Sequence, residues 1–187
     1  MNFQQLDIAA LLTVTPCKRG DDRGYFAEVF REDLFDSAAE QVRFVQENQS
    51  LSAKKGTVRG IHFQSHPCAQ GKLVRCTAGA IFDVAVDLRV GSPTYGRWAA
   101  VELTPEACNQ LWIPVGFGHA FCTLEPNSVV SYKVTSYYSA EFDKGLRWDD
   151  PTIAIQWPDC IDPETLSVKD RAQPLLNDLP TYFRYKD

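Results

Sequence analysis

The sequence lacks the features that mark disulfide-stapled, secreted and membrane-spanning proteins. It has 187 residues and six cysteines, at positions 17, 68, 76, 108, 122 and 160, none of them in a CxxC pair. A chain of this length can bury a core without disulfides, so we expect free and mostly buried thiols in a reducing compartment. No uninterrupted apolar stretch approaches the roughly 20 residues that a bilayer requires, and Met1–Asp7 contains no charged segment followed by an apolar run. These absences predict a soluble, cytoplasmic protein.

An excess of positive charge is also missing. The chain carries 19 Lys and Arg against 24 Asp and Glu, a net charge of −5. General nucleic-acid and membrane-surface binders usually present a basic face, so we expect this protein to belong to neither class. A small anionic ligand remains compatible, because a local cluster of Arg and Lys can hold a phosphate on an acidic protein. Repeats and low-complexity linkers are absent, and 44% hydrophobic residues predict a single folded domain over 1–187.

Short runs rich in Val, Ile, Trp and Tyr predict many β-strands. Within 72–88, apolar and polar side chains alternate, so Val84 and Val86 share one face while Asp83 and Asp87 share the other. Further strand signals run at 57–63, 97–103, 109–113, 119–124, 128–137 and 153–157. Turns rich in Pro and Gly separate them.

Only one helix is predicted, from Arg31 to about Val42. Many short strands with little helix are typical of a sandwich or barrel, and here an all-β, cupin-type jelly roll with short peripheral helices fits best. The N-terminal segment and the C-terminal tail are expected to pack on the barrel or on a partner subunit. The apolar stretch Ile8–Val14 adds the hypothesis that the N-terminal segment exchanges between subunits.

The histidines do not complete a metal site. Pro114-x-Gly116-x-x-His119 matches the second half of the metal-binding cupin signature, but the first half needs His-x-His and then Glu. Gln64 stands at the second His position, which leaves His62 and His119 as candidates where a catalytic metal takes about three protein ligands. We therefore expect no metal, and a histidine used for proton transfer instead.

Four residues are candidates for acid-base chemistry. His62 ends a predicted strand; an isolated His is more often a hydrogen-bonded core residue, but Asp170 could orient it as carboxylates do in catalytic pairs. Tyr132 is either a structural tyrosine or a general acid across the substrate from His62. Lys72 is either a surface lysine or a cation that stabilises a developing enolate.

Two arginines next to glycines are candidates for binding phosphate. Arg23 and Arg59 could each form bidentate contacts with an anion, although a surface salt bridge explains either one. A regular strand would place Arg59 and His62 on opposite faces, and a bulge at Gly60 would bring both into one site.

Taken in order, fragments along nearly the whole chain resemble the dTDP-4-dehydrorhamnose 3,5-epimerase family. The fragments are Asp22-Arg23-Gly24-x-Phe26-x-Glu28, Gln46-x-Asn48-x-Ser50, Arg59-Gly60-Ile61-His62-Phe63-Gln64, Gly71-Lys72, Asp83-x-x-x-Asp87-Leu88-Arg89, Pro114-x-Gly116-x-x-His119-x-Phe121, Tyr132-Lys133, Tyr137-Tyr138 and Gly145-x-x-Trp148-x-Asp150-Pro151. Each is weak alone, but their order and spacing together are specific.

The resemblance implies a cupin-type jelly roll, a homodimer, and no metal or other cofactor. It implies inversion at C3 and C5 of dTDP-4-dehydro-6-deoxy-D-glucose, which gives dTDP-4-dehydro-L-rhamnose for L-rhamnose biosynthesis. It assigns His62 as the base with Asp170 as its partner, Tyr132 as the proton donor on the opposite face, and Lys72 as the group that steadies the enolate. The substrate-binding residues it implies are Arg23, Phe26, Glu28, Gln46, Asn48, Arg59, His119, Tyr138, Asp143 and Lys169.

Other functions stay open on the sequence. A single-carbon epimerase or a ketoisomerase acting on a related 4-keto sugar nucleotide would share the fold and many of the residues. A non-enzymatic cupin that binds a sugar nucleotide would need neither base nor acid, and a metal-dependent cupin oxygenase would need bound iron or manganese.

Overall fold

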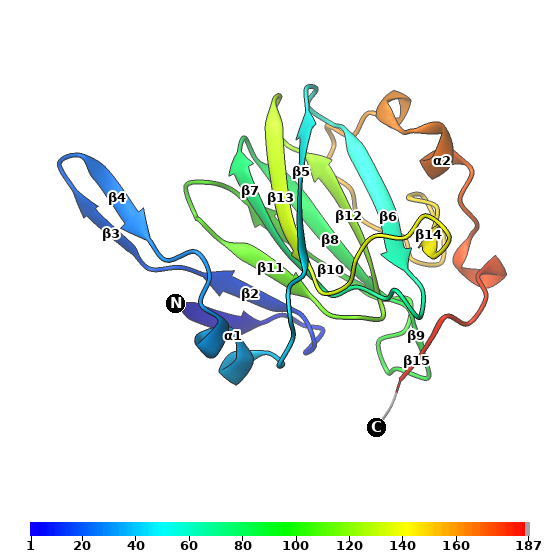
Figure 1. Cartoon of the computed structure of the whole chain (residues 1–187). Helices are drawn as coiled ribbons and strands as arrows, with labels where there is room; N and C mark the ends of the chain where they lie inside the picture. Colours follow the sequence, from blue (N-terminus) through cyan, green and yellow to red (C-terminus); the bar gives the residue numbers. More distant parts are fainter. Residues whose placement is uncertain (186–187) are drawn as a thin grey trace.

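Two β-sheets face each other in the computed structural model, which describes residues 1–185 (Figure 1). In spatial order, the larger sheet contains β1 (Asn2–Gln5), β2 (Leu12–Thr15), β11 (Gln110–Ile113), β7 (Lys72–Ala78), β13 (Ser128–Val134) and β5 (Gln46–Ser52). The smaller sheet contains β10 (Trp98–Leu103), β8 (Ile81–Asp87), β12 (Phe117–Thr123), β6 (Val58–Gln64) and β14 (Asp143–Gly145). Neighbouring strands in both sheets are antiparallel, so the predicted all-β, cupin-type jelly roll is confirmed.

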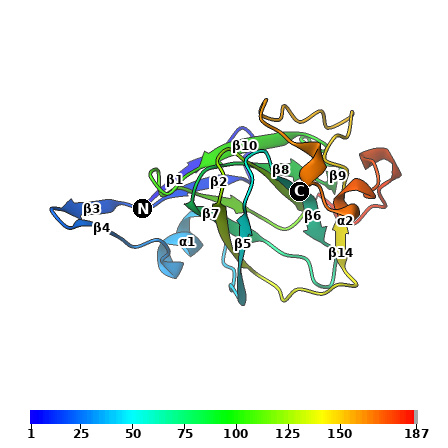
Figure 2. The same ribbon diagram turned by 90° about the horizontal axis from the view of Figure 1, so that it is seen from above.

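The remaining elements are short and peripheral. Two strands, β3 (Lys18–Asp21) and β4 (Gly24–Ala27), form a hairpin that projects from the body of the molecule (Figures 1 and 2). Near the C-terminus, β15 (Phe183–Arg184) pairs in parallel with β9 (Arg89–Val90). The helices are α1 (Glu32–Ala38), α2 (Val168–Arg171) and 3-10 turns at Pro163–Thr165 and Leu176–Asp178. Within residues 1–185, none of these helices is both long enough and apolar enough to span a bilayer.

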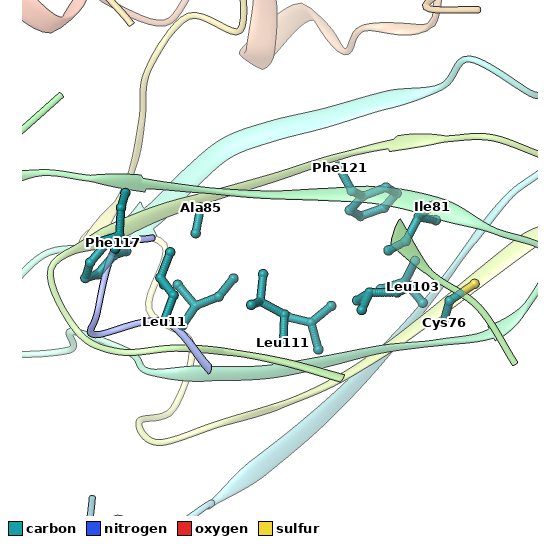
Figure 3. Packing of buried hydrophobic residues seen from close by; sticks show 12 residues of the cluster. Leu11, Cys76, Ile81, Ala85, Leu103, Leu111, Phe117 and Phe121 are labelled. Carbon is teal, nitrogen blue, oxygen red and sulfur yellow. The ribbon is translucent and has the colours of Figure 1, made fainter. Parts of the chain in front are cut away.

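The core between the sheets forms because alternate side chains on each strand point inward. Leu111 and Cys76 from the larger sheet meet Ile81, Ala85 and Phe121 from the smaller one (Figure 3). All five are almost completely buried. This apolar packing fixes the spacing between the sheets, and therefore the positions of the polar residues that share the same interior.

The outer face of the smaller sheet is buried as well. Val84 and Val86 point away from the core between the sheets and pack with Ile61. Leu176 and Phe183 from the C-terminal segment join the same cluster. The segment after residue 158 thus covers this sheet, and α2 is held beside β6.

Several element boundaries differ from those predicted. The 72–88 segment is two strands separated by a turn at Gly79, the strand predicted at 128–137 ends at Val134, and the helix ends at Ala38 rather than near Val42. The strand predicted at 153–157 is wrong: Ala154 has a φ of 50°, which breaks the extended conformation, and Ile153 packs without a ladder partner. The strands near 57–63, 97–103, 109–113 and 119–124 are confirmed to within a few residues.

Candidate active site

A bulge in β6 presents His62 and Arg59 to the same space. Opposite β12, His119 pairs with His62 and Phe121 pairs with Arg59, so one residue of β12 faces two residues of β6. Gly60 has a φ of 122°, and a side chain there would collide with Ala120 at 2.5 Å. Only glycine fits this position, and the bulge expected from the sequence is present.

His62 is held by a carboxylate from the C-terminal segment. Its Nε2 lies 2.5 Å from Oδ1 of Asp170, which is on α2 and 4% exposed. The hydroxyl of Ser167 accepts a hydrogen bond from the backbone N–H of Asp170 and so caps α2. Burial raises the pKa of Asp170, but the interactions with His62, together with smaller effects of Ser167 and Lys169, outweigh it and leave this pKa below its usual value. The carboxylate is therefore ionised and fixes the orientation of the imidazole.

Tyr132 and Lys72 face the same interior from the other sheet. Tyr132 shares the inward face of β13 with Val130 and Val134, as the alternation predicts, and packs against the core between the sheets. Burial raises the pKa of Tyr132, so the phenol keeps its proton near neutral pH.

Lys72 begins β7 and is almost completely buried, with its ammonium 3.3 Å from the backbone oxygen of His62. Desolvation lowers the pKa of Lys72 to about 8, against the opposing influence of Asp143 and Asp83. Within residues 1–185 Lys72 has no ion-pair partner at bonding distance, so this buried cation can respond to a negative charge that develops beside it.

Two adjoining cavities meet at these side chains, one of about 260 Å³ and one of about 240 Å³. They share four lining residues, which are His62, Lys72, Tyr132 and Lys169. The first is also lined by Gln46, Asn48, Phe63, Gln64, Gln70, Tyr138 and Asp143, and the second by Ser50, Arg59, His119, Phe121, Ser167 and Asp170. The imidazole and the phenol therefore open onto one continuous cleft between the sheets.

A polar network lies at the mouth of this cleft. Oδ2 of Asp143, on β14, accepts hydrogen bonds from the hydroxyl of Tyr138 at 3.0 Å and from the ammonium of Lys169 at 2.5 Å. Tyr138 is 58% exposed and borders the first cavity, so its aromatic ring is accessible to a planar group. The neighbouring side chains of Gln46 and Asn48 are hydrogen-bonded to each other at 2.8 Å.

A second His–Asp pair lies deeper in the same interior. His119 Nε2 is 2.7 Å from Oδ1 of Asp83, whose side chain is fully buried. Burial lowers the pKa of His119 despite the opposing effect of Asp83, so this imidazole is neutral near pH 7. The other oxygen of Asp83 is buried without a hydrogen-bond partner in the described part of the chain.

Three of the predicted site residues do not reach the cleft within one chain. Arg23, Phe26 and Glu28 lie on or directly after the projecting β3–β4 hairpin. Phe26 is 67% exposed, and Arg23 pairs with Asp21 at the surface. The other eleven predicted residues line the cleft.

Sequence reasoning missed three residues that shape the cleft. The sequence indicated Gln64 as a break in the metal signature and as the end of a family motif, and Asp83 as part of a family motif and of a polar strand face, but neither as a site residue. Both lie where strand alternation turns them inward, so the alternation was the available signal. Gln70 precedes β7 in an irregular segment and has no such signal.

Metal-ligating side chains do not cluster in this cleft. Residues 1–185 contain no group of three or more His, Cys, Asp and Glu side chains arranged to hold an ion. His62 and His119 are each bonded to a carboxylate through Nε2, and of the two only His62 is substantially exposed to the cleft. The cleft thus combines a carboxylate-supported imidazole, a protonated phenol and a buried ammonium.

A family model described as dTDP-4-dehydrorhamnose 3,5-epimerase matches residues 5–178. A curated dTDP-4-dehydrorhamnose 3,5-epimerase from Sinorhizobium fredii is 58% identical over 185 residues, which cover 99% of this chain and 94% of that protein. A dTDP-4-dehydrorhamnose 3-epimerase from Streptomyces niveus is 38% identical, over 97% of this chain and 90% of that protein.

Among solved structures, a dTDP-6-deoxy-D-glucose-3,5-epimerase from Legionella pneumophila in complex with dTDP-4-keto-L-rhamnose superposes with a TM-score of 0.93. It is 41% identical, with 100% of this chain and 99% of that chain covered. The match therefore includes the barrel, the cleft and both ends of the chain together. This chain belongs to the dTDP-4-dehydrorhamnose 3,5-epimerase family.

Proposed function

We propose that this protein inverts C3 and C5 of dTDP-4-dehydro-6-deoxy-D-glucose and yields dTDP-4-dehydro-L-rhamnose. The observation that carries the proposal is that His62, bonded to Asp170, opens onto the same cleft as Tyr132 and Lys72. Family membership and the high identity to a named 3,5-epimerase support the substrate and the reaction.

In this mechanism His62 is the base. Both C3 and C5 flank the C4 ketone, so their protons are acidic enough for an imidazole to remove. Asp170 holds the ring and stabilises the imidazolium that forms. The electron pair of the broken C–H bond passes to the C4 oxygen and produces an enolate.

Lys72 and Tyr132 complete the cycle. The Lys72 ammonium, desolvated and close to the backbone of His62, stabilises the enolate oxygen. Tyr132, whose raised pKa keeps it protonated, returns a proton to the same carbon from the opposite face and so inverts it. Each inversion removes one proton from the substrate and returns one. Proton exchange with water then restores neutral His62 and protonated Tyr132 before the next carbon reacts, and the mechanism we propose uses no metal or other cofactor.

The residues around the cleft would hold the rest of the substrate. Tyr138 would stack on the thymine ring, and Arg59 and Lys169 would contact the diphosphate or neighbouring groups. Gln46, Asn48, His119 and Asp143 would bind the sugar and the thymidine.

We also propose that the active form is a cytoplasmic homodimer in which each chain is one epimerase domain. Arg23, Phe26 and Glu28 lie on a segment that projects away from the cleft of their own chain, with exposed aromatic rings. A second copy would receive this hairpin beside its own cleft and give the three residues a role in binding. A monomeric mass in light scattering at micromolar concentration would contradict this arrangement.

A second candidate is epimerisation at one carbon only. The Streptomyces niveus relative is named a 3-epimerase, and it matches nearly the whole of this chain. The same base, acid and cation would serve a single inversion.

Solvent exchange separates the two candidates. The protein is incubated with the 4-keto sugar nucleotide in deuterated water, and the labelled carbons are assigned by NMR. We expect deuterium at both C3 and C5, together with the L-configured product. Label at C3 alone would replace the proposal with the single-carbon reaction.

A further inference from the structure

The loop that joins β13 to β14 (residues 135–142) crosses from the larger sheet to the smaller one beside the cleft (Figure 1). It leaves the strand that carries Tyr132, carries Tyr138 itself, and enters the strand that carries Asp143. None of its residues is in a helix or strand, and Tyr138 is mostly exposed. Some other part of the molecule must therefore hold the loop in place.

Gln64, at the end of β6, makes the central contacts. Its Nε2 donates to the backbone oxygens of Tyr137 at 3.2 Å and Cys68 at 2.9 Å. Its Oε1 accepts from the backbone N–H of Ser139 at 2.6 Å. The side chain is 4% exposed, so all three bonds are largely shielded from water. Gln64 thus holds the loop on both sides of Tyr138.

Two further glutamines complete the attachment. Gln70 Nε2 donates to the backbone oxygen of Ser136 at 2.7 Å, and Gln46 Oε1 accepts from the backbone N–H of Tyr138 at 3.1 Å. Four consecutive loop residues are therefore bonded to glutamine side chains from β5, β6 and the segment before β7. All three glutamines also line the cleft.

The chemistry of the amide explains the residue type at position 64. A primary amide has two N–H donors and one carbonyl acceptor, and Gln64 uses all of these. An imidazole at this position, as in the metal-binding cupin signature, offers only one donor and one acceptor when neutral. The residue that interrupts the metal signature is thus the one that the loop requires.

We propose that Gln64 is a positioning residue that fixes the β13–β14 loop, and through it the Tyr138 ring, for binding the nucleotide part of the substrate. Gln70 supports the same loop from its start. The proposal rests on the function proposed above, in which Tyr138 stacks on the base. Gln64 acts through the loop, so its loss should weaken binding and leave the proton transfers at His62 and Tyr132 nearly unchanged.

The test is Gln64→Met, which keeps the length of the side chain and removes its hydrogen bonds. We expect the Kd for dTDP, measured by calorimetry, and the KM for the 4-keto sugar nucleotide to rise about tenfold while kcat changes less than about threefold. Backbone amide exchange should rise at Tyr138 and Ser139 and stay unchanged in β8. Gln156→Met, at an exposed position outside the cleft, is the matched control and should leave Kd unchanged.

A double-mutant cycle separates positioning from a general loss of structure. In a Tyr138→Ala background, Gln64→Met should change the Kd for dTDP less than about twofold, because the ring that it positions is gone. An equal loss of dTDP affinity in the presence and absence of the Tyr138 ring would overturn the proposal. So would a fall in kcat as large as the fall in kcat/KM.

Gln70→Ala gives an independent test if Gln64→Met does not fold, because it removes only the bond to Ser136. It should raise the Kd for dTDP about threefold with the same dependence on Tyr138. An unchanged Kd would overturn the proposal. Wild-type protein that binds dTDP without epimerising the sugar nucleotide would overturn the proposed function and leave this inference standing.

Discussion

Two His–Asp pairs lie side by side in this barrel, and their surroundings give them different properties. His62 and His119 are cross-strand partners on β6 and β12, and each bonds a carboxylate through Nε2. The His62 side chain is 33% exposed to the cleft, while that of His119 is 8% exposed. Asp170 comes from a helix outside the barrel, and Asp83 from the neighbouring strand β8.

The difference shows that pairing alone does not make a proton-transfer group. Burial lowers the pKa of His119 and holds this imidazole neutral, so it is suited to hydrogen bonding at a fixed position. His62 faces the cleft and can exchange protons with a ligand. The two pairs should therefore respond differently to substitution, one in rate and the other in stability.

The largest expected effect is at the exposed pair. His62→Ala should lower kcat about 100- to 10,000-fold, the usual contribution of a general base. The measurement is product formation under saturating substrate, with thermal unfolding as the check on folding. Near-normal turnover would remove His62 from its assigned role.

Asp170→Asn should come next. The amide keeps the size of the side chain but cannot stabilise an imidazolium, so we expect kcat to fall on the order of 100-fold. The Kd for dTDP should stay nearly unchanged, because the Asp170 carboxylate, although it borders the cleft, is hydrogen-bonded to His62. A variant with weakened dTDP binding and normal kcat would assign Asp170 to binding instead.

Lys72 interacts electrostatically with Asp83 and His119, and its own ionisation sets a pH limit on the reaction. Its pKa of about 8 lies below the usual lysine value, so the ammonium is lost as the pH rises through 8. We expect kcat to fall about tenfold between pH 7 and pH 9, the change in protonated fraction of one such group.

Lys72→Arg should move the alkaline fall in kcat, the alkaline limb of the pH profile, to higher pH, because a guanidinium stays charged. Lys54→Arg, at an exposed position, serves as the matched control. An alkaline limb that does not move in the Lys72 variant would show that another group causes it.

At the buried His119–Asp83 pair we expect the smallest effect on the reaction rate and a clear effect on stability. Asp83→Ala leaves the buried His119 without its partner and should cost about 1–3 kcal/mol of unfolding free energy in urea. Asp149→Ala breaks a partly exposed pair with Arg147 and should cost less than about 1 kcal/mol. Equal losses of unfolding free energy in Asp83→Ala and Asp149→Ala would mean that burial does not make the Asp83–His119 pair more important for stability than a surface pair.

The sequence predicted the barrel better than its ends. Strands such as β8 and β12 are apolar and buried over most of their length, so composition and alternation identify them. The N-terminal strands β1, β3 and β4 are largely exposed, carry no alternating apolar face, and were not predicted. The apolar alternation of residues 153–157 wrongly predicted a strand, because alternate side chains of this segment pack against the cluster on the outer face of the smaller sheet without pairing with a neighbouring strand.

Within the site, local geometry was predictable and long-range contacts were not. The bulge at Gly60 was predictable because Arg59, Gly60 and His62 lie within one strand, and only a bulge brings Arg59 and His62 to the same face. The contact of His62 with Asp170 spans 108 residues and depends on how the C-terminal segment covers the smaller sheet. No pattern near Asp170 encodes that path, so the residues alone offered the pair as a candidate and only the family resemblance assigned it.

In the proposed mechanism, the base His62 and the acid Tyr132 work on opposite faces of the sugar. The most direct test is Tyr132→Phe in deuterated water, with exchange and inversion followed separately by NMR. We expect this variant to wash deuterium into the carbons beside the ketone through His62 while inversion falls at least about 100-fold, because the donor on the opposite face is missing. Inversion at the wild-type rate in Tyr132→Phe would contradict the central claim.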